Sequence, residues 1–106
     1  MTHDKRDANE ADLVRLWESA GGLWYPQART AGFDGVAVFR GRILLVEVKD
    51  GSLPPSRRTL TANEQRQRQR IEDQNVAYTL WQCVDDVVAD LEAVIPVTYI
   101  SRKWQV

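Results

Sequence analysis

The apolar positions of the chain follow two different spacings, and the change between them outlines its secondary structure. Before residue 21 they recur every three or four residues, as on one face of a helix: Leu13, Val14, Leu16, Trp17 and Ala20. Asp7 and Glu10 have the spacing of a capping box at the start of this helix, and Gly21-Gly22 provides a stop. We expect a helix that begins near Asp7 and turns Glu10 toward its buried face.

Three short apolar runs follow, and each has the composition of a β-strand. They are residues 23–26, 36–39 and 43–48, the last two rich in β-branched side chains. Only Arg40-Gly41 separates the second run from the third, which predicts a tight hairpin, although arginine adopts positive φ less readily than asparagine. The sequence thus predicts one strand followed by a β-hairpin.

The second half of the chain alternates between helix and strand. A loop with two prolines and a glycine comes first. Thr61 and Glu64 form a second capping-box pattern, so we expect a helix over 61–75, on the outside of the fold because few of its residues are apolar. Residues 76–83 have the pattern of a strand, and 85–94 that of a helix with two aspartates in its first turn.

The resulting order, helix–strand–strand–strand–helix–strand–helix, predicts an α/β (α+β) fold with a central mixed sheet flanked by helices. The 106 residues suffice for a single domain, whose core we place at about 9–93. Trp17 and Trp81 are expected in this core. In the C-terminal extension, 94–106, apolar and polar residues alternate after Pro96, which allows an extra edge strand or pairing with a second subunit.

Composition limits the cellular setting. No apolar run is long enough to span a bilayer, and the charged start of the chain lacks the pattern of a signal peptide. The lone Cys83 cannot close an internal disulfide, so we expect a reducing, cytoplasmic location.

Charge is concentrated in one segment, although the net charge is only −1. Residues 40–70 hold eight basic and three acidic residues, whereas the rest of the chain holds six basic and twelve acidic ones. Such a stripe suits a phosphate backbone. The candidate nucleic-acid contacts in its second half are Arg57, Arg58, Arg66, Arg68 and Arg70. A solvated helix with interspersed charges explains the same pattern equally well.

The predicted hairpin has a consequence for two acidic side chains. Counting outward from its two-residue turn places Asp34 opposite Glu47, and Lys49 points to the same side because side chains alternate along a strand. Directly opposed Cβ atoms lie roughly 4.5–5.5 Å apart, a distance at which like charges repel. A slip of one residue in the register would turn the carboxylates to opposite faces.

A hard divalent cation such as Mg²⁺ or Mn²⁺ would resolve this repulsion, because it takes oxygen ligands from both carboxylates. Asp34 and Glu47 are therefore candidate metal ligands. Lys49 would orient a metal-bound water or stabilise charge on a phosphate. Taken singly, Asp-Gly is more often a turn and Glu-x-Lys more often a solvated strand pattern. The shared register and the neighbouring basic segment favour a site.

These residues occur in stretches that resemble a known family. "GFDGVAVFRGRILLVEVKDG" and "PPSRRTLTANEQ" look like the PD-(D/E)XK nuclease superfamily, close to its small VRR-NUC-like and Holliday-junction-resolvase-like members from phages and bacteria. The resemblance covers roughly residues 9–93. It implies a restriction-endonuclease-like fold and a Mg²⁺-dependent endonuclease that cuts structured or branched DNA as a homodimer. It also implies the cytoplasm of a bacterial or phage-infected cell, with other DNA-processing proteins as partners.

The resemblance implies roles for individual residues of the hairpin. Asp34 and Glu47 stand at the positions of the family's two metal-binding acids, and Lys49 at that of its catalytic lysine. Val48, between them, would offer its main-chain carbonyl to the metal.

Two helical residues also match family positions. Gln65 stands where relatives carry a glutamine turned toward the site, and Glu10 where many keep a first-helix glutamate near the metal. On the residues alone, Glu10 fits a capping role equally well, and Gln65 fits a solvated residue better. Phe33 and Gly35, which flank the first acid, depart from the family's usual proline and aliphatic residue, which leaves the subfamily open.

Two other functions stay open. A non-catalytic nucleic-acid-binding or regulatory module would keep the fold for docking alone, and an interaction protein would pair through its C-terminal strand. The intact Asp34, Glu47 and Lys49 favour the nuclease. Nothing in the sequence resembles a base-reading helix or a zinc finger, so specificity would come from the shape of the nucleic acid or from a partner.

Overall fold

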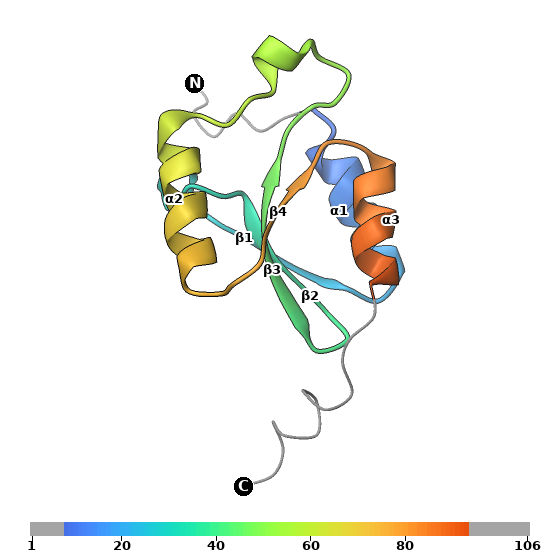
Figure 1. Ribbon diagram of the computed structural model, residues 1–106. Helices are drawn as coiled ribbons and strands as arrows, with labels where there is room; N and C mark the ends of the chain where they lie inside the picture. Colours follow the sequence, from blue (N-terminus) through green and yellow to red (C-terminus); the bar gives the residue numbers. More distant parts are fainter. Residues whose placement is uncertain (1–7, 94–106) are drawn as a thin grey trace, which may run out of the picture.

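The computed structural model describes residues 8–93 and confirms the predicted order of helices and strands (Figure 1). Within that range the elements are α1 (Glu10–Ser19), β1 (Leu23–Pro26), η1 (Arg29–Ala31), β2 (Gly35–Phe39), β3 (Arg42–Val48), η2 (Pro55–Arg57), α2 (Ala62–Asp73), β4 (Tyr78–Trp81) and α3 (Val84–Glu92). The strand allowed within 94–106 lies outside the described residues. No helix among residues 8–93 is long and apolar enough to cross a membrane.

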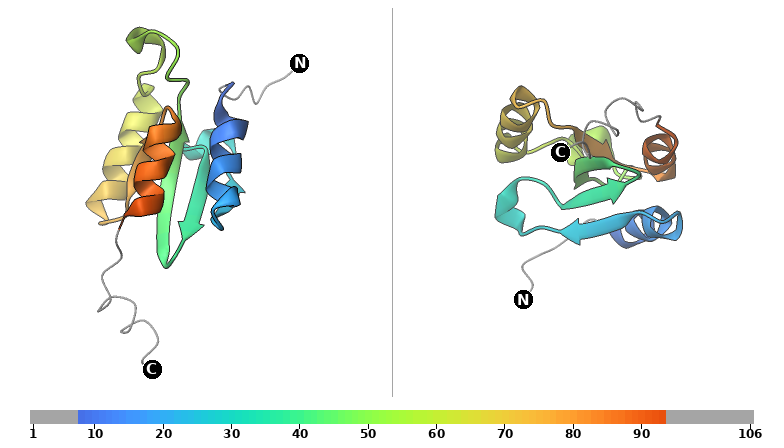
Figure 2. Two further views of the ribbon diagram at one scale, coloured as in Figure 1. Left: turned by 90° about the vertical axis from the view of Figure 1, so that its right-hand side faces the viewer. Right: turned by 90° about the horizontal axis from the view of Figure 1, so that it is seen from below.

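The strands form one mixed sheet, as predicted, and their order within it is β1-β2-β3-β4. β1 pairs with β2, and β2 with β3, in antiparallel fashion, whereas β4 runs parallel to β3. A parallel neighbour requires a crossover, because the chain must return to the starting end of the sheet, and α2 makes this return. α2 covers one face of the sheet, and α1 and α3 cover the other (Figures 1 and 2).

The hairpin between β2 and β3 has the predicted register, which ends with Gly35 paired to Val46. Arg40 and Gly41 have φ values of 49° and 81°, so both turn residues adopt the positive φ of a tight hairpin. The Arg40 guanidinium lies 5.0 Å from the centroid of the Phe39 ring, a cation–π contact beside the turn.

The apolar core lies between the sheet and the α1–α3 pair. Its buried members come from both helices and three strands: Leu13, Trp17, Ala37, Leu44, Val46, Val48, Trp81 and Val87. Trp17 and Trp81 are buried as predicted, with ring centroids 5.2 Å apart. Trp24, which the sequence leaves unplaced, stacks on Trp81 at 5.6 Å.

The two faces of β3 differ in chemistry. Val46 and Val48 point into the core, so the alternation of the strand turns Leu45, Glu47 and Lys49 toward α2. The sheet therefore separates its apolar side from the side that bears the predicted site.

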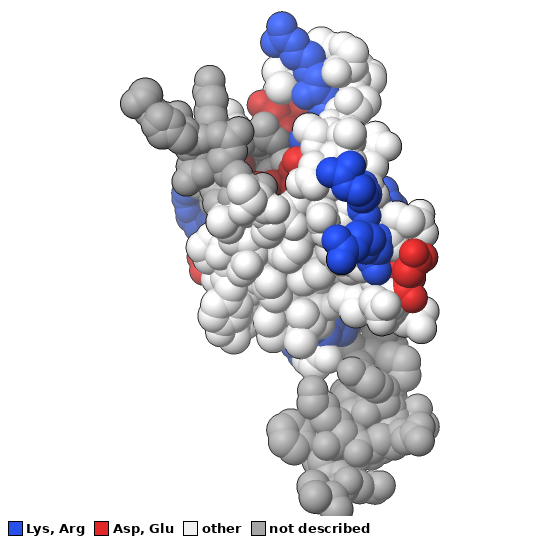
Figure 3. Space-filling model, turned by 90° about the vertical axis from the view of Figure 1, so that its left-hand side faces the viewer, with Lys and Arg blue, Asp and Glu red and all other residues white. Residues whose placement is uncertain are grey.

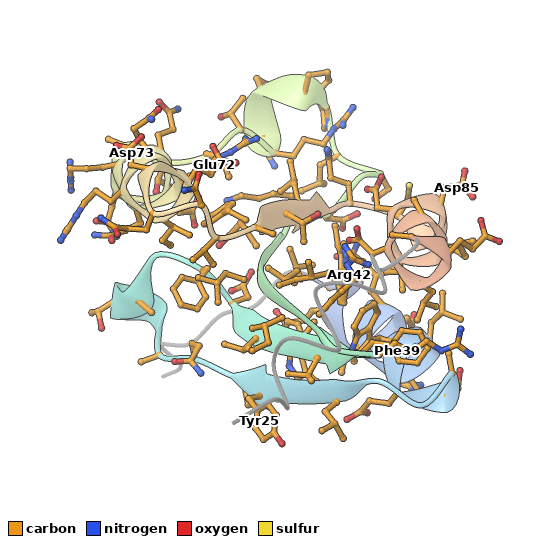
Figure 4. The ribbon with its side chains drawn as sticks, turned by 60° about the horizontal axis from the view of Figure 1, so that its bottom comes forward. Tyr25, Phe39, Arg42, Glu72, Asp73 and Asp85 are labelled. Carbon is orange, nitrogen blue, oxygen red and sulfur yellow. The ribbon has the colours of Figure 1, made fainter. Side chains whose placement is uncertain are left out.

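Hydrogen bonds of Asp90 connect α3 to the sheet. The Asp90 carboxylate accepts hydrogen bonds from the Trp81 indole (2.8 Å) and the Thr79 hydroxyl (3.2 Å). Arg42 donates to the main-chain carbonyl of Asp90 (2.6 Å), and Figure 4 shows Arg42 on the α3 side of the sheet.

α1 begins at Glu10, three residues later than predicted, with Asn9 as its N-cap. The Asn9 side chain does not cap the helix. Its Nδ2 donates instead to the carbonyl oxygens of Lys49 (3.2 Å) and Gln82 (3.1 Å), where β3 and β4 end. Asp7, the predicted cap, lies outside the described residues, and the described helix has Asn9 as its N-cap instead. Glu10 is buried, as predicted, at 9% exposure.

Candidate active site

Asp34 lies just before β2 and is held by three hydrogen bonds. Its amide donates to the Val46 carbonyl (2.8 Å), and its carbonyl accepts from the Gln27 amide (2.9 Å). Its carboxylate Oδ2 accepts a hydrogen bond from the Val48 amide (2.7 Å). The side chain thus continues the β2–β3 ladder one step beyond the last backbone pair, which fixes the carboxylate against β3.

Glu47 and Lys49 lie at the C-terminal end of β3, on the face that α2 covers. Glu47 is only 4% exposed, and Lys49 Nζ lies 3.5 Å from its Oε2. Asp34 is close enough for its negative charge to raise the pKa of Glu47. The structure therefore brings together the three residues that the predicted register singles out.

A further acid, Glu64, joins this cluster from α2. Its Oε1 lies 2.9 Å from Lys49 Nζ. The same oxygen accepts from the Thr61 amide (2.9 Å), and Thr61 Oγ1 accepts from the Glu64 amide (3.2 Å), so the predicted capping box is confirmed. The capping-box spacing explains Glu64 without any site. Nothing in the sequence signals that its carboxylate also reaches Lys49.

Gln65 does not have the orientation that the resemblance implies. Its side chain is exposed, and its Nε2 donates to the Leu60 carbonyl (3.0 Å). Successive residues of a helix point about 100° apart, so Glu64 and Gln65 cannot both face β3. Glu64 is the residue of α2 that reaches the cluster.

The pKa values of the two glutamates shift in opposite directions in this environment. Burial, together with the negative charges of Asp34 and Glu64, raises the pKa of Glu47 from 4.5 to about 9, although Lys49 opposes the shift. Burial also disfavours the charge of Glu64, but hydrogen bonds from the Thr61 amide and Lys49 outweigh it and lower the pKa of Glu64. Glu47 is therefore the acid that ionises with difficulty unless a further cation approaches.

Tyr78 borders the cluster and holds the loop that leads to Asp34. Its buried hydroxyl donates to the Gly32 carbonyl (2.9 Å). Gly32 has a φ of 85°, and a Cβ there would lie 2.4 Å from Gln67 Cγ, so only glycine fits where the loop meets α2. Burial, and then the charge of Glu47, raises the pKa of Tyr78, so its hydroxyl stays a donor. The sequence shows this tyrosine only as a strand residue.

Glu10 approaches the same end of the sheet from the opposite face. α1 lies across the sheet from α2 (Figure 2), and the Asn9 contact with the Lys49 carbonyl brings its first turn beside the end of β3. The burial of Glu10 agrees with its predicted position. A role of Glu10 near a metal stays a prediction.

The donor atoms at this end of the sheet suit a small hard cation. Asp34 and Glu47 offer carboxylate oxygens, and Val48 lies next to Glu47 with its main-chain carbonyl. Mg²⁺ binds through one or two carboxylates and keeps several waters, which this set allows. Among residues 8–93, no three acidic, histidine or cysteine side chains are spaced to hold a metal by themselves, as a structural Zn²⁺ would require.

Arg58 differs from the other arginines predicted to contact nucleic acid. Its Nε donates to the Leu53 carbonyl (2.9 Å), and its Nη1 donates to Gln82 Oε1 (2.6 Å). The side chain ties the proline-containing loop to the end of β4. Arg58 therefore has a structural role within the fold, which the sequence prediction of a nucleic-acid contact does not anticipate.

The remaining candidates are exposed: Arg57, Arg66, Arg68 and Arg70. Arg66 donates to Asn63 (3.1 Å) and Arg68 pairs with Glu72 (3.3 Å), but contacts between exposed side chains contribute little and exchange readily. Figure 3 shows the face covered by α2, with acidic side chains in a recess and basic side chains at its border.

A separate hollow of about 450 Å³ lies between β3 and the C-terminal half of α2. Its lining residues are Leu45, Gln67, Arg70, Ile71, Asp73, Gln74 and Val76. The cluster around Lys49 lies at the opposite, N-terminal end of α2. The hollow is therefore not part of the candidate site.

The element order and the mixed sheet agree with the restriction-endonuclease-like fold that the resemblance implies. A solved structure described as "VRR_NUC domain" matches with a TM-score of 0.62 at 21% sequence identity, over 81% of this chain and 92% of that one. The chain thus has a VRR-NUC-like fold, which confirms the fold expected from the resemblance. No family model matches the sequence, and no curated protein matches it.

Proposed function

We propose that the protein is a Mg²⁺-dependent endonuclease that hydrolyses DNA phosphodiester bonds, with Mn²⁺ able to replace Mg²⁺. The observation that carries this proposal is the placement of Asp34 and Glu47 on one face of the sheet, with Lys49 Nζ 3.5 Å from the Glu47 carboxylate. The nuclease-type fold supports the class of reaction.

Each residue has a distinct role in the proposed reaction. Asp34, Glu47 and the Val48 carbonyl would hold the cation, with Glu10 nearby. When bound, the ion would supply Lewis acidity and a water of lowered pKa. Lys49 orients the attacking water and stabilises charge on the phosphate. The water oxygen forms a bond to phosphorus, and the bond between phosphorus and the oxygen of the leaving strand breaks. The water gives up a proton, and the leaving oxygen takes one up.

Recognition of DNA would depend on charge rather than on base reading. The exposed arginines of α2 and η2 lie on the face that bears the carboxylates (Figure 3). Contacts of this kind position a duplex without reading its sequence. Structured or branched DNA, recognised by its shape, is therefore the proposed substrate.

We also propose a homodimer, because nucleases that cut both strands of a duplex often pair two subunits. Residues 94–106, with their alternating pattern, are the proposed pairing segment. Other DNA-processing proteins would be further partners, in the cytoplasm of a bacterial or phage-infected cell.

Cleavage of a supercoiled plasmid and of a four-way junction tests the proposed function. We expect cleavage with Mg²⁺ or Mn²⁺ and none with EDTA. Glu47→Ala and Lys49→Ala should each lower the rate by about 10²- to 10³-fold, the effect typical of losing one such group. Glu18→Gln, an exposed charge change on α1, should leave the rate unchanged. A wild type that binds the junction but cuts under none of these conditions would favour the non-catalytic binding module.

A further inference from the structure

We propose that Glu64 is a positioning residue for Lys49, an acid at the start of α2 that holds the lysine ammonium in place for the reaction. This inference deepens the proposed function and rests on it. It concerns a residue that the resemblance does not single out, since the resemblance implies a role for Gln65.

Lys49 lies between two carboxylates. Its Nζ is 2.9 Å from Glu64 Oε1 and 3.5 Å from Glu47 Oε2, and its side chain is 14% exposed. A lysine ammonium is a point charge on a flexible four-carbon stem, so its direction depends on its partners. The shorter of the two contacts comes from α2 and not from the strand that carries the lysine.

Glu64 is itself held firmly. Its Oε1 accepts from the Thr61 amide (2.9 Å), and its own amide donates to Thr61 Oγ1 (3.2 Å). A capping box needs only an acceptor at this position, and glutamine provides one as well as glutamate does. The cap therefore does not require the negative charge of Glu64, whereas an ion pair with Lys49 does.

This difference allows the two roles to be separated by substitution. Glu64→Gln keeps the acceptor for the Thr61 amide and removes the charge that faces Lys49. Thr61→Ala does the reverse, because it removes one capping bond and leaves both charges. Glu18→Gln makes the same charge change on the opposite side of the sheet and serves as the control.

In Mg²⁺-dependent cleavage, we expect Glu64→Gln to lower kcat by roughly 10- to 100-fold with KM unchanged, because a displaced reacting group is costly. Its Tm should stay close to that of the wild type. Thr61→Ala should lower Tm by about 4–8 °C through the lost cap, with kcat near the wild-type value.

A second measurement follows Lys49 directly and needs neither metal nor DNA. The chain contains three lysines, Lys5, Lys49 and Lys103, so reductive methylation read by peptide mass spectrometry gives Lys49 with two references in the same sample. Relative to these references, we expect Lys49 to react several-fold faster in Glu64→Gln than in the wild type or in Glu18→Gln.

An unchanged Lys49 reactivity in Glu64→Gln would overturn the proposal. If the wild type cleaves DNA and Glu64→Gln has an equal or higher kcat, the proposal is overturned as well. Failure of the nuclease proposal has a different signature, since the wild type itself would not cleave. In that case the methylation rates still decide whether Glu64 holds Lys49.

Discussion

Glu47 is the residue at which burial and charge conflict most strongly. It is almost fully buried, beside Asp34 and Glu64, so ionising its carboxyl group costs free energy. The positive charge of Lys49 offsets only part of this cost. Strongly shifted acids of this kind concentrate at functional sites, where a ligand or substrate supplies the missing compensation. In the metal-free protein, ionisation of Glu47 therefore destabilises the folded state relative to the unfolded chain.

We expect Glu47→Gln to be more stable than the wild type in metal-free buffer at high pH. The pKa of Glu47 rises from 4.5 to about 9 on folding, so between these values the native state binds more protons than the unfolded chain. Wild-type stability therefore falls as pH rises through this window, and glutamine removes the dependence. The difference should reach the order of 1–3 kcal/mol near pH 8. Urea unfolding in EDTA at pH 5 and pH 8 measures it.

Addition of Mg²⁺ provides the control for this substitution. A ligand that binds only the folded state stabilises it, by about 2.7 kcal/mol at one hundred times its dissociation constant. We expect Mg²⁺ to stabilise the wild type and to leave Glu47→Gln almost unchanged. Equal responses of the two proteins to pH and to Mg²⁺ would contradict the assignment of Glu47 as a metal ligand.

Tyr78 tests how firmly the loop before Asp34 is held. Tyr78→Phe removes the hydroxyl and leaves the Gly32 carbonyl without this donor, so we expect a loss of about 1–2 kcal/mol and slower cleavage. Tyr25→Phe, at an exposed position on the edge strand β1 (Figure 4), should change neither property. Thermal unfolding and plasmid cleavage measure both. A Tyr78→Phe protein equal to the wild type would show that other contacts hold the loop.

Part of this cluster can be predicted from the sequence. A two-residue turn and the period of a strand place Asp34, Glu47 and Lys49 on one face by counting alone. Glu64 and Tyr78 cannot be found in this way, because their positions depend on how α2 and β4 pack against β3. The same limit applies to Arg58, whose partner Gln82 lies 24 residues away in the chain.

α1 and α2 both begin beside the C-terminal end of β3, where Glu47 lies. α2 begins beside Lys49 through Glu64, and the carboxylate of Glu64 suits the positive end of the helix dipole. α1 begins beside the same strand through Asn9, which bridges the carbonyls of Lys49 and Gln82. The helices thus restrain this end of β3 from both faces.

Asn9 is the residue through which this restraint from α1 can be tested. Asn9→Ala loses two hydrogen bonds to main-chain carbonyls, so we expect a loss of about 1–3 kcal/mol. Asn9→Asp, which has nearly the same shape, should be at least as harmful because a carboxylate has no donor for these carbonyls. Denaturant unfolding measures both. An Asn9→Asp protein as stable as the wild type would show that the amide donations contribute little.

The existence of the elements follows from local pattern, but their ends do not. Periodicity and turn residues predict each α-helix and strand of the described chain in the correct order, but not the short 3-10 helices η1 and η2. The spacing of Asp7 and Glu10 resembles a capping box, yet the described helix begins at Glu10 with Asn9 as its N-cap, and the Asn9 side chain bonds to Lys49, 40 residues away, instead of capping the helix. The capping box of Thr61 and Glu64 forms as its spacing predicts, and the Glu64 carboxylate keeps its bond to the Thr61 amide while it also contacts Lys49.

Across the whole molecule, the arginines predicted to contact nucleic acid should fall into two functional groups. We expect Arg57→Ala and Arg70→Ala to weaken DNA binding, to reduce the salt dependence of log K by about one each, and to leave Tm unchanged. Arg58→Ala should instead lower Tm, because it loses its bonds to Leu53 and Gln82. Binding titrations at several salt concentrations and thermal unfolding separate the groups. A changed Tm in Arg57→Ala would contradict the division.

β3 occupies an interior position in the sheet, bonded to β2 on one side and to β4 on the other. Strands bordered on both sides are usually the last to exchange their amide hydrogens, since they open only when the domain does. Glu47 and Val48, two of the proposed metal ligands, therefore lie on a strand that is bonded on both sides, and Asp34 and Lys49 directly adjoin the two interior strands. Heating should abolish catalysis and cooperative structure at one common temperature, with no inactive but folded species between them.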